Sequence, residues 1–293
     1  MNVKKWFLAM RPWSFSMSAI SVTIGALWSV GETFSFPLYF LTLVAMISLH
    51  GATNLINDYF DVKSGVDVPD APTVKYRPHP LAHQEIGLAG VLAVAVTMYA
   101  VGAGVGFYLV YVSGWELVAI GAAGVFISVF YTAWPAELKY KALGEVAVFL
   151  CWGPLAVLGA NFVQTGAFSP ALLLVSIPFG LLVGLVLLAN NLRDTCYDSE
   201  QNITTVPILL GESRGRALFI GLVALSFISV AIMSVLGPLG WWSLIVLLAL
   251  PVAAPLCKMV YTGCPDDADA RTAKLDTVFG ILLALSILAE RLF

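Results

Sequence analysis

Long apolar runs recur along the whole chain, and they limit its possible folds more than any other feature. Of its 293 residues, 59% are hydrophobic and only 11% are charged, a composition unlike that of a soluble globular protein. A helix that crosses a bilayer needs about 20 predominantly apolar residues. Because lipid offers no hydrogen-bond partners, each such segment must satisfy its own backbone groups, and a helix does so. The chain is therefore predicted to be an all-α polytopic membrane protein.

Charged, Pro and Gly residues divide the sequence into about nine apolar runs that are long enough to be membrane helices. The expected spans are residues 14–30, 36–57, 86–110, 115–131, 145–162, 170–192, 215–236, 239–258 and 273–292. We expect these helices to form a single domain, residues 1–293, made of two pseudo-repeat halves at about 14–131 and 145–292.

The distribution of basic residues predicts the orientation of these helices. If the N-terminus is cytoplasmic, the segments expected inside contain all but one of the 15 Lys and Arg residues, the exception being Arg291. The four expected outer loops, near 31–35, 111–115, 163–169 and 237–240, contain none. This asymmetry follows the positive-inside rule. We therefore predict a multi-pass protein of the cell membrane whose N-terminus and longer polar loops face the cytoplasm.

Two clusters of Asn and Asp residues, Asn54–Asp67 and Asn190–Asp198, each end an apolar run at equivalent points of the two halves. Residues spaced i, i+4 share one face of a helix. That spacing relates Asn54 to Asp58, Asn57 to Asp61, and Asn190 to Asp194 and then Asp198. One Asp-rich helix end can simply be solvated. Two ends with matched spacing and the same topological position favour one site built from both.

Carboxylates at the C-terminal end of a helix repel one another and the negative end of the helix dipole. Cations must therefore neutralise them, and Mg²⁺ (magnesium) is the natural partner because it takes oxygen ligands and bridges carboxylates to a diphosphate. Both clusters are expected on the cytoplasmic side. The expected metal ligands are Asp58, Asp61, Asp194 and Asp198.

Protein groups in the same segments could also bind a diphosphate. Arg recognises phosphate through its forked geometry and Lys acts as a point charge, although such residues are also expected in inner loops for orientation alone. Arg77, Lys139 and Arg193 are the strongest candidates, because each neighbours a segment that contains Pro or Asp. The full set of expected diphosphate-binding residues is Asn54, Asn57, Arg77, Tyr131, Lys139, Asn190 and Arg193.

These motifs resemble those of a known family. Asn57-Asp58-Tyr59-Phe60-Asp61, the later Asp194-x-x-x-Asp198, and the loop from Tyr131 to Lys139 are similar to the UbiA superfamily of intramembrane aromatic prenyltransferases. Arg11-Pro12 before the first span and the nine expected spans extend the resemblance over almost the whole chain. The continuation to Gly65-Val66-Asp67 is most similar to the menaquinone branch, the 1,4-dihydroxy-2-naphthoate polyprenyltransferases.

The resemblance implies a helical bundle around a central cavity with a cytoplasmic cap. It implies a Mg²⁺-dependent transfer of a polyprenyl group from an isoprenoid diphosphate to an aromatic quinone precursor, with release of diphosphate, in menaquinone biosynthesis. The expected partners are a polyprenyl diphosphate, the aromatic acceptor and the lipid bilayer, but no nucleic acid. The expected catalytic residues are Asp61, Asp67, Asp198 and Lys139, with Asp67 or Asp198 as the base.

The sequence departs from the family pattern at two places. Gly65 stands where the first motif usually has a third Asp, so Asp67 is expected to replace it. The segment 201–207 lacks the basic residue that usually follows the second motif. Because of this second departure, the sequence does not decide the acceptor. It is either a dihydroxynaphthoate or another molecule, such as 4-hydroxybenzoate, geranylgeranylglyceryl phosphate or a haem.

A different class of protein would also place acids in a helical bundle with repeated halves. An ion-coupled transporter has this composition, but it holds its acids near the membrane midplane on broken helices. The acids of this chain are expected at inner helix ends, which favours the enzyme.

Overall fold

The computed structural model describes residues 3–293, and within this range the regular structure is helical, with no β-strand. The long helical segments are α3 (Phe36–Ser64), α5 (Leu88–Ser113), α9 (Pro170–Arg193), α12 (Glu212–Leu236) and α14 (Ala268–Leu292). Two further long segments are composite. They are α7 (Gly144–Leu150), η3 (Cys151–Leu155) and α8 (Ala156–Thr165), and then η4 (Trp241–Ala249) and α13 (Leu250–Thr262).

Seven of these segments in the described chain are long and apolar enough to cross a membrane, which is the architecture of a multi-pass membrane protein. The remaining two expected spans, 14–30 and 115–131, are helical but shorter: α2 (Phe15–Leu27) has 13 residues and α6 (Leu117–Phe130) has 14. The all-helical class is therefore confirmed. The count of nine spans, the division into pseudo-repeat halves and the cytoplasmic orientation stay predictions.

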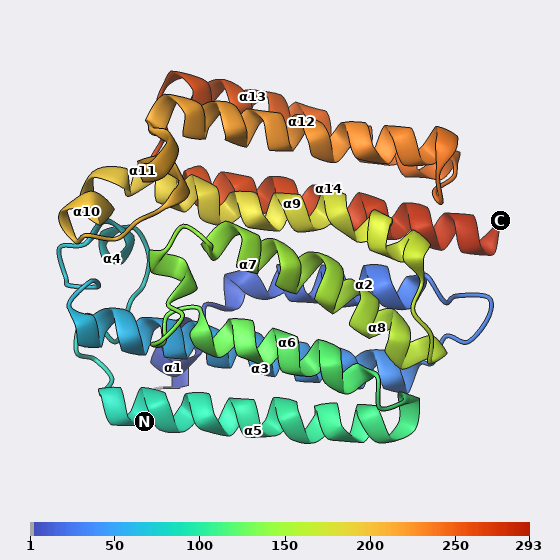
Figure 1. Cartoon of the computed structure of the whole chain (residues 1–293), viewed down its shortest axis with the longest axis horizontal. Coiled ribbons are helices and arrows are strands. Elements are labelled where there is room, and N and C mark those ends of the chain that lie inside the picture. The colour runs from blue at the N-terminus through green and yellow to red at the C-terminus, as the bar shows by residue number, and fades with distance from the viewer. Residues whose placement is uncertain (1–2) are drawn as a thin grey trace.

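The helices lie side by side along the long axis of the molecule, with α5 on one flank and α12 and α13 on the other (Figure 1). Helices α4 (Pro72–Tyr76), α10 (Thr195–Glu200) and α11 (Val206–Leu210) gather at one end of the bundle, and the C-terminus lies at the other (Figure 1). The other short elements are α1 (Val3–Ala9), η1 (Pro12–Ser14) and η2 (Leu138–Tyr140). Short helices and loops thus cap one end of an apolar bundle.

Helix α3 extends further than the sequence predicts, to Ser64 instead of residue 57. It ends at Gly65, whose φ of 80° is the left-handed conformation that glycine adopts at helix C-termini. The amides of Val66 and Asp67 both donate to the carbonyl of Asp61, at 2.9 and 3.1 Å. The first Asn/Asp cluster, apart from Asp67, therefore lies within the last turns of α3, and the chain then folds back on it.

The core centres on α9 and α14, where large aromatic and aliphatic side chains such as Phe179 and Phe279 are fully buried. Close backbone contact brings η3 onto α9. A Cβ atom placed on Gly180 would lie 2.8 Å from the Cα atom of Gly153, and one on Gly153 would lie 3.2 Å from the carbonyl oxygen of Ser176. Small residues allow this approach between membrane helices. The contact positions the π-helical turn η3, which forms part of the wall of the cavity described below.

We expect Gly180→Ala to cost about 1–3 kcal/mol of folding free energy, because the new methyl group meets backbone atoms that cannot move aside. The change should lower the thermal unfolding temperature of the purified protein in detergent. The matched control is Gly221→Ala in α12, where a Cβ atom would have no neighbour within 4 Å. Equal melting temperatures for the Gly180 variant and the wild type would show that the two helices are not in close contact.

Candidate active site

A cavity of about 770 Å³ opens at the capped end of the bundle, between α2, α3, α9 and α14. It is the place where both polar clusters meet. The predicted site residues that line it are Asn54, Asn57, Asp61, Asp67, Arg77, Tyr131, Lys139, Asn190, Asp194 and Asp198. Two other predicted residues, Asp58 and Arg193, do not belong to its lining.

The carboxylate of Asp61 faces the cavity and is held by the loop between α6 and α7. Lys139 Nζ donates to it at 2.5 Å, and the hydroxyl of Tyr140 donates to its second oxygen. The side chain of Asp61 is 1% exposed, so these bonds offset much of the cost of burying its charge. Burial alone would lower the pKa of Lys139, but the carboxylates of Asp61 and Asp67 raise it above its usual value. Lys139 therefore remains a cation in the cavity wall.

Asp58 lies behind this wall instead of beside Asp61. Its carboxylate pairs with Arg11, and it lies 3.8 Å from the guanidinium of Arg77 and 3.5 Å from His79 Nε2. Asp58 is not part of the cavity lining, whereas Asp61 is. Its expected role as a metal ligand stays a prediction, and the arrangement favours Asp61 over Asp58.

Asp67 reaches the cavity because of the turn at Gly65. Its carboxylate accepts a hydrogen bond of 2.9 Å from His79 Nε2, and the ligand atoms of Asp58, Asp67 and His79 lie within 4.8 Å of one another. Burial by itself would raise the pKa of Asp67, but the hydrogen bond from His79 and the charge of Lys139 hold it well below the usual range. Asp67 therefore stays ionised at neutral pH. From the sequence, this residue is expected to replace the third Asp of the first motif, whose position is taken by Gly65, and that role stays a prediction.

The second cluster keeps its i, i+4 spacing across a break in the helix. Helix α9 ends at Arg193 and α10 begins at Thr195, yet the amide of Asp194 bonds to the carbonyl of Asn190 at 3.0 Å. The amide of Asp198 bonds in turn to the carbonyl of Asp194 at 2.9 Å. The three side chains therefore share one stripe, and all of them line the cavity.

Arg193 connects the second cluster to its neighbours without facing the cavity. Its guanidinium binds the carboxylate of Asp194 at 2.7 and 2.9 Å and that of Asp269, on α14, at 3.1 Å. It also donates to Thr73 of α4 at 3.1 Å and to Asn190 at 2.7 Å. With its side chain 5% exposed and its donors satisfied by protein, Arg193 joins α9, α4 and α14. Its expected contact with a diphosphate stays a prediction that this geometry does not favour.

Asp198 differs from the other carboxylates of the cavity. Within residues 3–293, its side chain has no hydrogen bond or ion pair, whereas Asp61, Asp67 and Asp194 each have a cationic or imidazole partner. Burial and the charge of Asp194 raise the pKa of Asp198 to about 7. Its oxygens are therefore the ones most available to a ligand.

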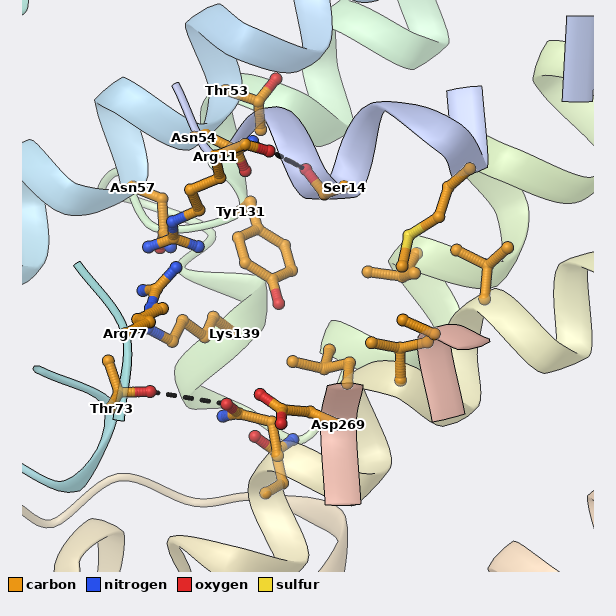
Figure 2. Close-up of a pocket in the computed structure, with 18 of the residues that line it drawn as sticks. Arg11, Ser14, Thr53, Asn54, Asn57, Thr73, Arg77, Tyr131, Lys139 and Asp269 are labelled. Atoms are coloured by element: carbon orange, nitrogen blue, oxygen red, sulfur yellow. Dashed lines mark hydrogen bonds between the residues drawn. The ribbon is translucent and has the colours of Figure 1, made fainter. Parts of the chain in front are cut away.

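Three cationic side chains converge on one side of the cavity. Figure 2 shows the side chains of Arg11, Arg77 and Lys139 close together, with the hydroxyl of Tyr131 pointing into the space between them and Asp269. Burial and the charge of Arg11 lower the pKa of Arg77 to about 10, so Arg77 is still charged at neutral pH. The Lys139 amide donates to the Tyr131 carbonyl at 2.8 Å, which folds their loop so that both side chains face inward.

The motifs did not identify several residues of this site. Arg11 lines the cavity, and its backbone has a positive φ of 56°, a strained conformation that non-glycine residues adopt mainly where surrounding contacts enforce it. The only sequence signal was its place before Pro12 at the start of the first span. The hydroxyl of Tyr140 and the carboxylate of Asp269 had no distinguishing signal, because only contacts between distant segments bring them to the site.

Comparisons with known proteins relate this chain to one family. The UbiA prenyltransferase family matches residues 18–282. The chain is 29% identical over 283 residues to a 1,4-dihydroxy-2-naphthoate octaprenyltransferase of Bacillus subtilis, covering 95% of this chain and 90% of the relative. It is 31% identical over 288 residues to UbiA prenyltransferase domain-containing protein 1 of Danio rerio, covering 97% and 83%.

Solved structures show the same fold. A UbiA homologue from Archaeoglobus fulgidus bound to GPP and Mg²⁺ superposes with a TM-score of 0.69 at 14% identity, over 97% of this chain and 99% of the other. A homologue from Aeropyrum pernix K1 gives 0.70 at 18% identity, over 94% and 98%. Since the family match spans nearly the whole chain, the protein belongs to the UbiA prenyltransferase family.

Proposed function

We propose that the protein transfers a polyprenyl group from an isoprenoid diphosphate to an aromatic quinone precursor similar to 1,4-dihydroxy-2-naphthoate, with release of diphosphate, in menaquinone biosynthesis. One observation carries this proposal. A single cavity combines carboxylates from α3 and from α9–α10, cations from two loops, and an apolar inner wall. The polar part of this cavity matches the diphosphate head of such a donor, and the apolar part matches its hydrocarbon tail.

The residues of the cavity fit a Mg²⁺ ion. Mg²⁺ prefers oxygen ligands and is commonly bound through one or two carboxylates together with substrate phosphates. The cavity offers Asp61, Asp194 and Asp198, and Oδ1 of Asn57 is buried without a hydrogen-bond partner in the described chain. These four residues would hold the ion. When bound, Mg²⁺ neutralises the charge that develops on the departing diphosphate.

The cationic side chains would orient the diphosphate. Arg77 and Lys139 line the cavity and remain charged at neutral pH, so they attract phosphate oxygens and stabilise the leaving group. Arg11 lies beside them, and its Nε atom is buried without a partner in the part of the chain that the structure describes. Arg193 acts differently, because it positions Asp194 and Asn190 from behind the wall.

The apolar wall would protect the reacting carbon. Carbon–oxygen cleavage at an allylic carbon produces positive charge that water would quench, so the site must be dry. Side chains such as Ile127, Val183 and Leu187 line the inner part of the cavity.

Of the two expected bases, Asp67 is already bonded to His79, whereas the carboxylate of Asp198 is free of protein partners in residues 3–293. Because neither oxygen of Asp198 has a partner among the described residues, one would hold the ion while the other would take the proton from the acceptor ring.

Two observations support the acceptor and the membrane side that we propose. The Bacillus subtilis relative is named for transfer to 1,4-dihydroxy-2-naphthoate, and it aligns over nearly the whole chain. Other relatives, such as those of Danio rerio and Xenopus tropicalis, carry the less specific name of UbiA prenyltransferase domain-containing protein 1, which names no acceptor. The bias of Lys and Arg toward the capped end supports a site on the cytoplasmic side of the cell membrane.

Removing single carboxylates should test the two-cluster site. We expect Asp61→Asn and Asp194→Asn to lower prenyl transfer by at least about 100-fold, the usual cost of losing one electrostatic contact to the transition state. The measurement is product formation in membranes with Mg²⁺ and a prenyl diphosphate. Glu200→Gln is a matched control, because Glu200 is an exposed carboxylate on α10 outside the cavity lining. Wild-type rates in either Asp variant would contradict the site.

Metal removal should test the role of Mg²⁺. Chelation with EDTA should abolish transfer, and added Mg²⁺ should restore it, because the cavity carboxylates repel the diphosphate unless a cation screens them. Binding of the donor to the purified protein should weaken in parallel, which gives a readout besides turnover. Full activity after exhaustive chelation would rule out a metal-dependent site.

A panel of acceptors should identify the second substrate. We expect product with 1,4-dihydroxy-2-naphthoate and at least about tenfold less with 4-hydroxybenzoate or geranylgeranylglyceryl phosphate, since shape differences in a buried pocket typically cost a factor of this size. Mass spectrometry of the products also shows whether the acceptor loses its carboxyl group, as the menaquinone branch requires. If the protein prefers a non-aromatic acceptor, the proposed substrate is wrong, but the assignment to the UbiA prenyltransferase family still holds.

A further inference from the structure

A second, smaller cavity of about 170 Å³ lies between α3, α5, α6 and α8. It adjoins the active-site cavity, because five residues line both: His50, Thr53, Ser128, Cys151 and Trp152. The remaining lining is mostly aliphatic side chains and glycines. We call this space the side chamber. It lies deeper in the bundle than the two acid clusters, since its α3 residues precede Asn54 along the helix.

Four of the five residues at the junction, all except Cys151, have their polar side-chain groups bonded to protein. The imidazole of His50 bonds to Ser14 at 3.1 Å and to Ser18 at 2.8 Å, and the indole of Trp152 donates to Ser18 at 2.9 Å. The hydroxyls of Thr53 and Ser128 lie 2.5 Å apart.

Ser128 also bonds to the hydroxyl of Tyr99 at 2.6 Å. Deeper in the chamber, the hydroxyl of Thr42 donates to the carbonyl of Leu38 at 2.7 Å. Apart from the thiol of Cys151, the chamber therefore presents no free polar side chain within residues 3–293. A hydroxylated or carboxylated aromatic acceptor would lose hydrogen bonds to water here without replacing them, whereas a hydrocarbon chain would lose none.

We propose that the side chamber binds part of the hydrocarbon tail of the prenyl diphosphate and thereby contributes to selection of tail length. This inference rests on the proposed function. The chamber is slightly larger than an apolar cavity of about 150 Å³ that accommodates benzene, so it has room for about one five-carbon isoprene unit. The five shared lining residues place the chamber directly beside the cavity that holds the diphosphate-binding residues, so both spaces lie within the length of a single donor.

Glycines on α6 determine how much the chamber can hold. Gly121 and Gly124 both line it, and a Cβ atom on either would have no neighbour within 4 Å. Because both glycines line the chamber, a larger side chain there would narrow it without displacing backbone. Val125 and Ile120, on either side of the pair, also face it. These two glycines are the specificity-determining positions of the proposal.

Gly124→Leu should fill the chamber and discriminate against long donors. We expect kcat/KM for octaprenyl diphosphate to fall about tenfold or more, because a misfit of one methylene in an apolar pocket is worth about 10–200-fold. The value for geranyl diphosphate should change far less, and Gly121→Ala should shift the long-to-short ratio in the same direction by a smaller factor. The control is Gly104→Leu, a helical glycine with open space around it that lines neither cavity.

The geranyl rate separates failure of this inference from failure of the proposed function. If wild-type protein transfers neither donor to an aromatic acceptor, the proposed function is wrong. If it transfers both, and the long-to-short ratio of kcat/KM in Gly124→Leu and Gly121→Ala equals that of the wild type, the chamber holds membrane lipid and the inference is overturned. A loss in Gly124→Leu that is equal for all donors, with an unchanged ratio in Gly121→Ala, overturns it as well.

Discussion

Pairing of buried charges between distant segments is the interaction on which this structure depends. An ionised group removed from water is costly unless an opposite charge and hydrogen bonds compensate it. Asp61 on α3 is therefore paired with Lys139 of a loop, and Arg193 on α9 with Asp269 on α14. These pairs connect segments at the capped end of the bundle. The same contacts that stabilise the capped end thus hold the functional groups in place.

The pairing also divides the carboxylates by function. Asp58 and Asp194 are bound by arginines, and Asp67 is bound by His79, so their positions are fixed before any ligand arrives. Asp198 lacks such a partner among the described residues and keeps its oxygens for a ligand or a proton. Electrostatic preorganisation of this kind is usually the largest contribution to catalysis of reactions in which charge develops.

Much of the fold and part of the site could be predicted from local patterns. Helix α9 begins at Pro170 and ends at Arg193, close to the expected 170–192, because a long apolar run bounded by Pro and charge has few alternatives in a membrane. The i, i+4 spacing placed Asn190, Asp194 and Asp198 on one stripe, which the structure confirms. The extension of α3 to Ser64 was missed because polar residues near a helix end do not themselves terminate it; Gly65 does.

By itself, the sequence determined that the chain is a bundle of membrane helices with two acid clusters at helix ends, since apolar length and residue spacing are local properties. Only the tertiary structure decided that Asp61 faces the cavity while Asp58 faces Arg11, and that Arg193 supports the wall instead of lining it. It also decided that a chamber opens beside Gly121 and Gly124. The physical reason is that the environment of a buried charge or a glycine is set by the segments packed against it, and these are remote in sequence.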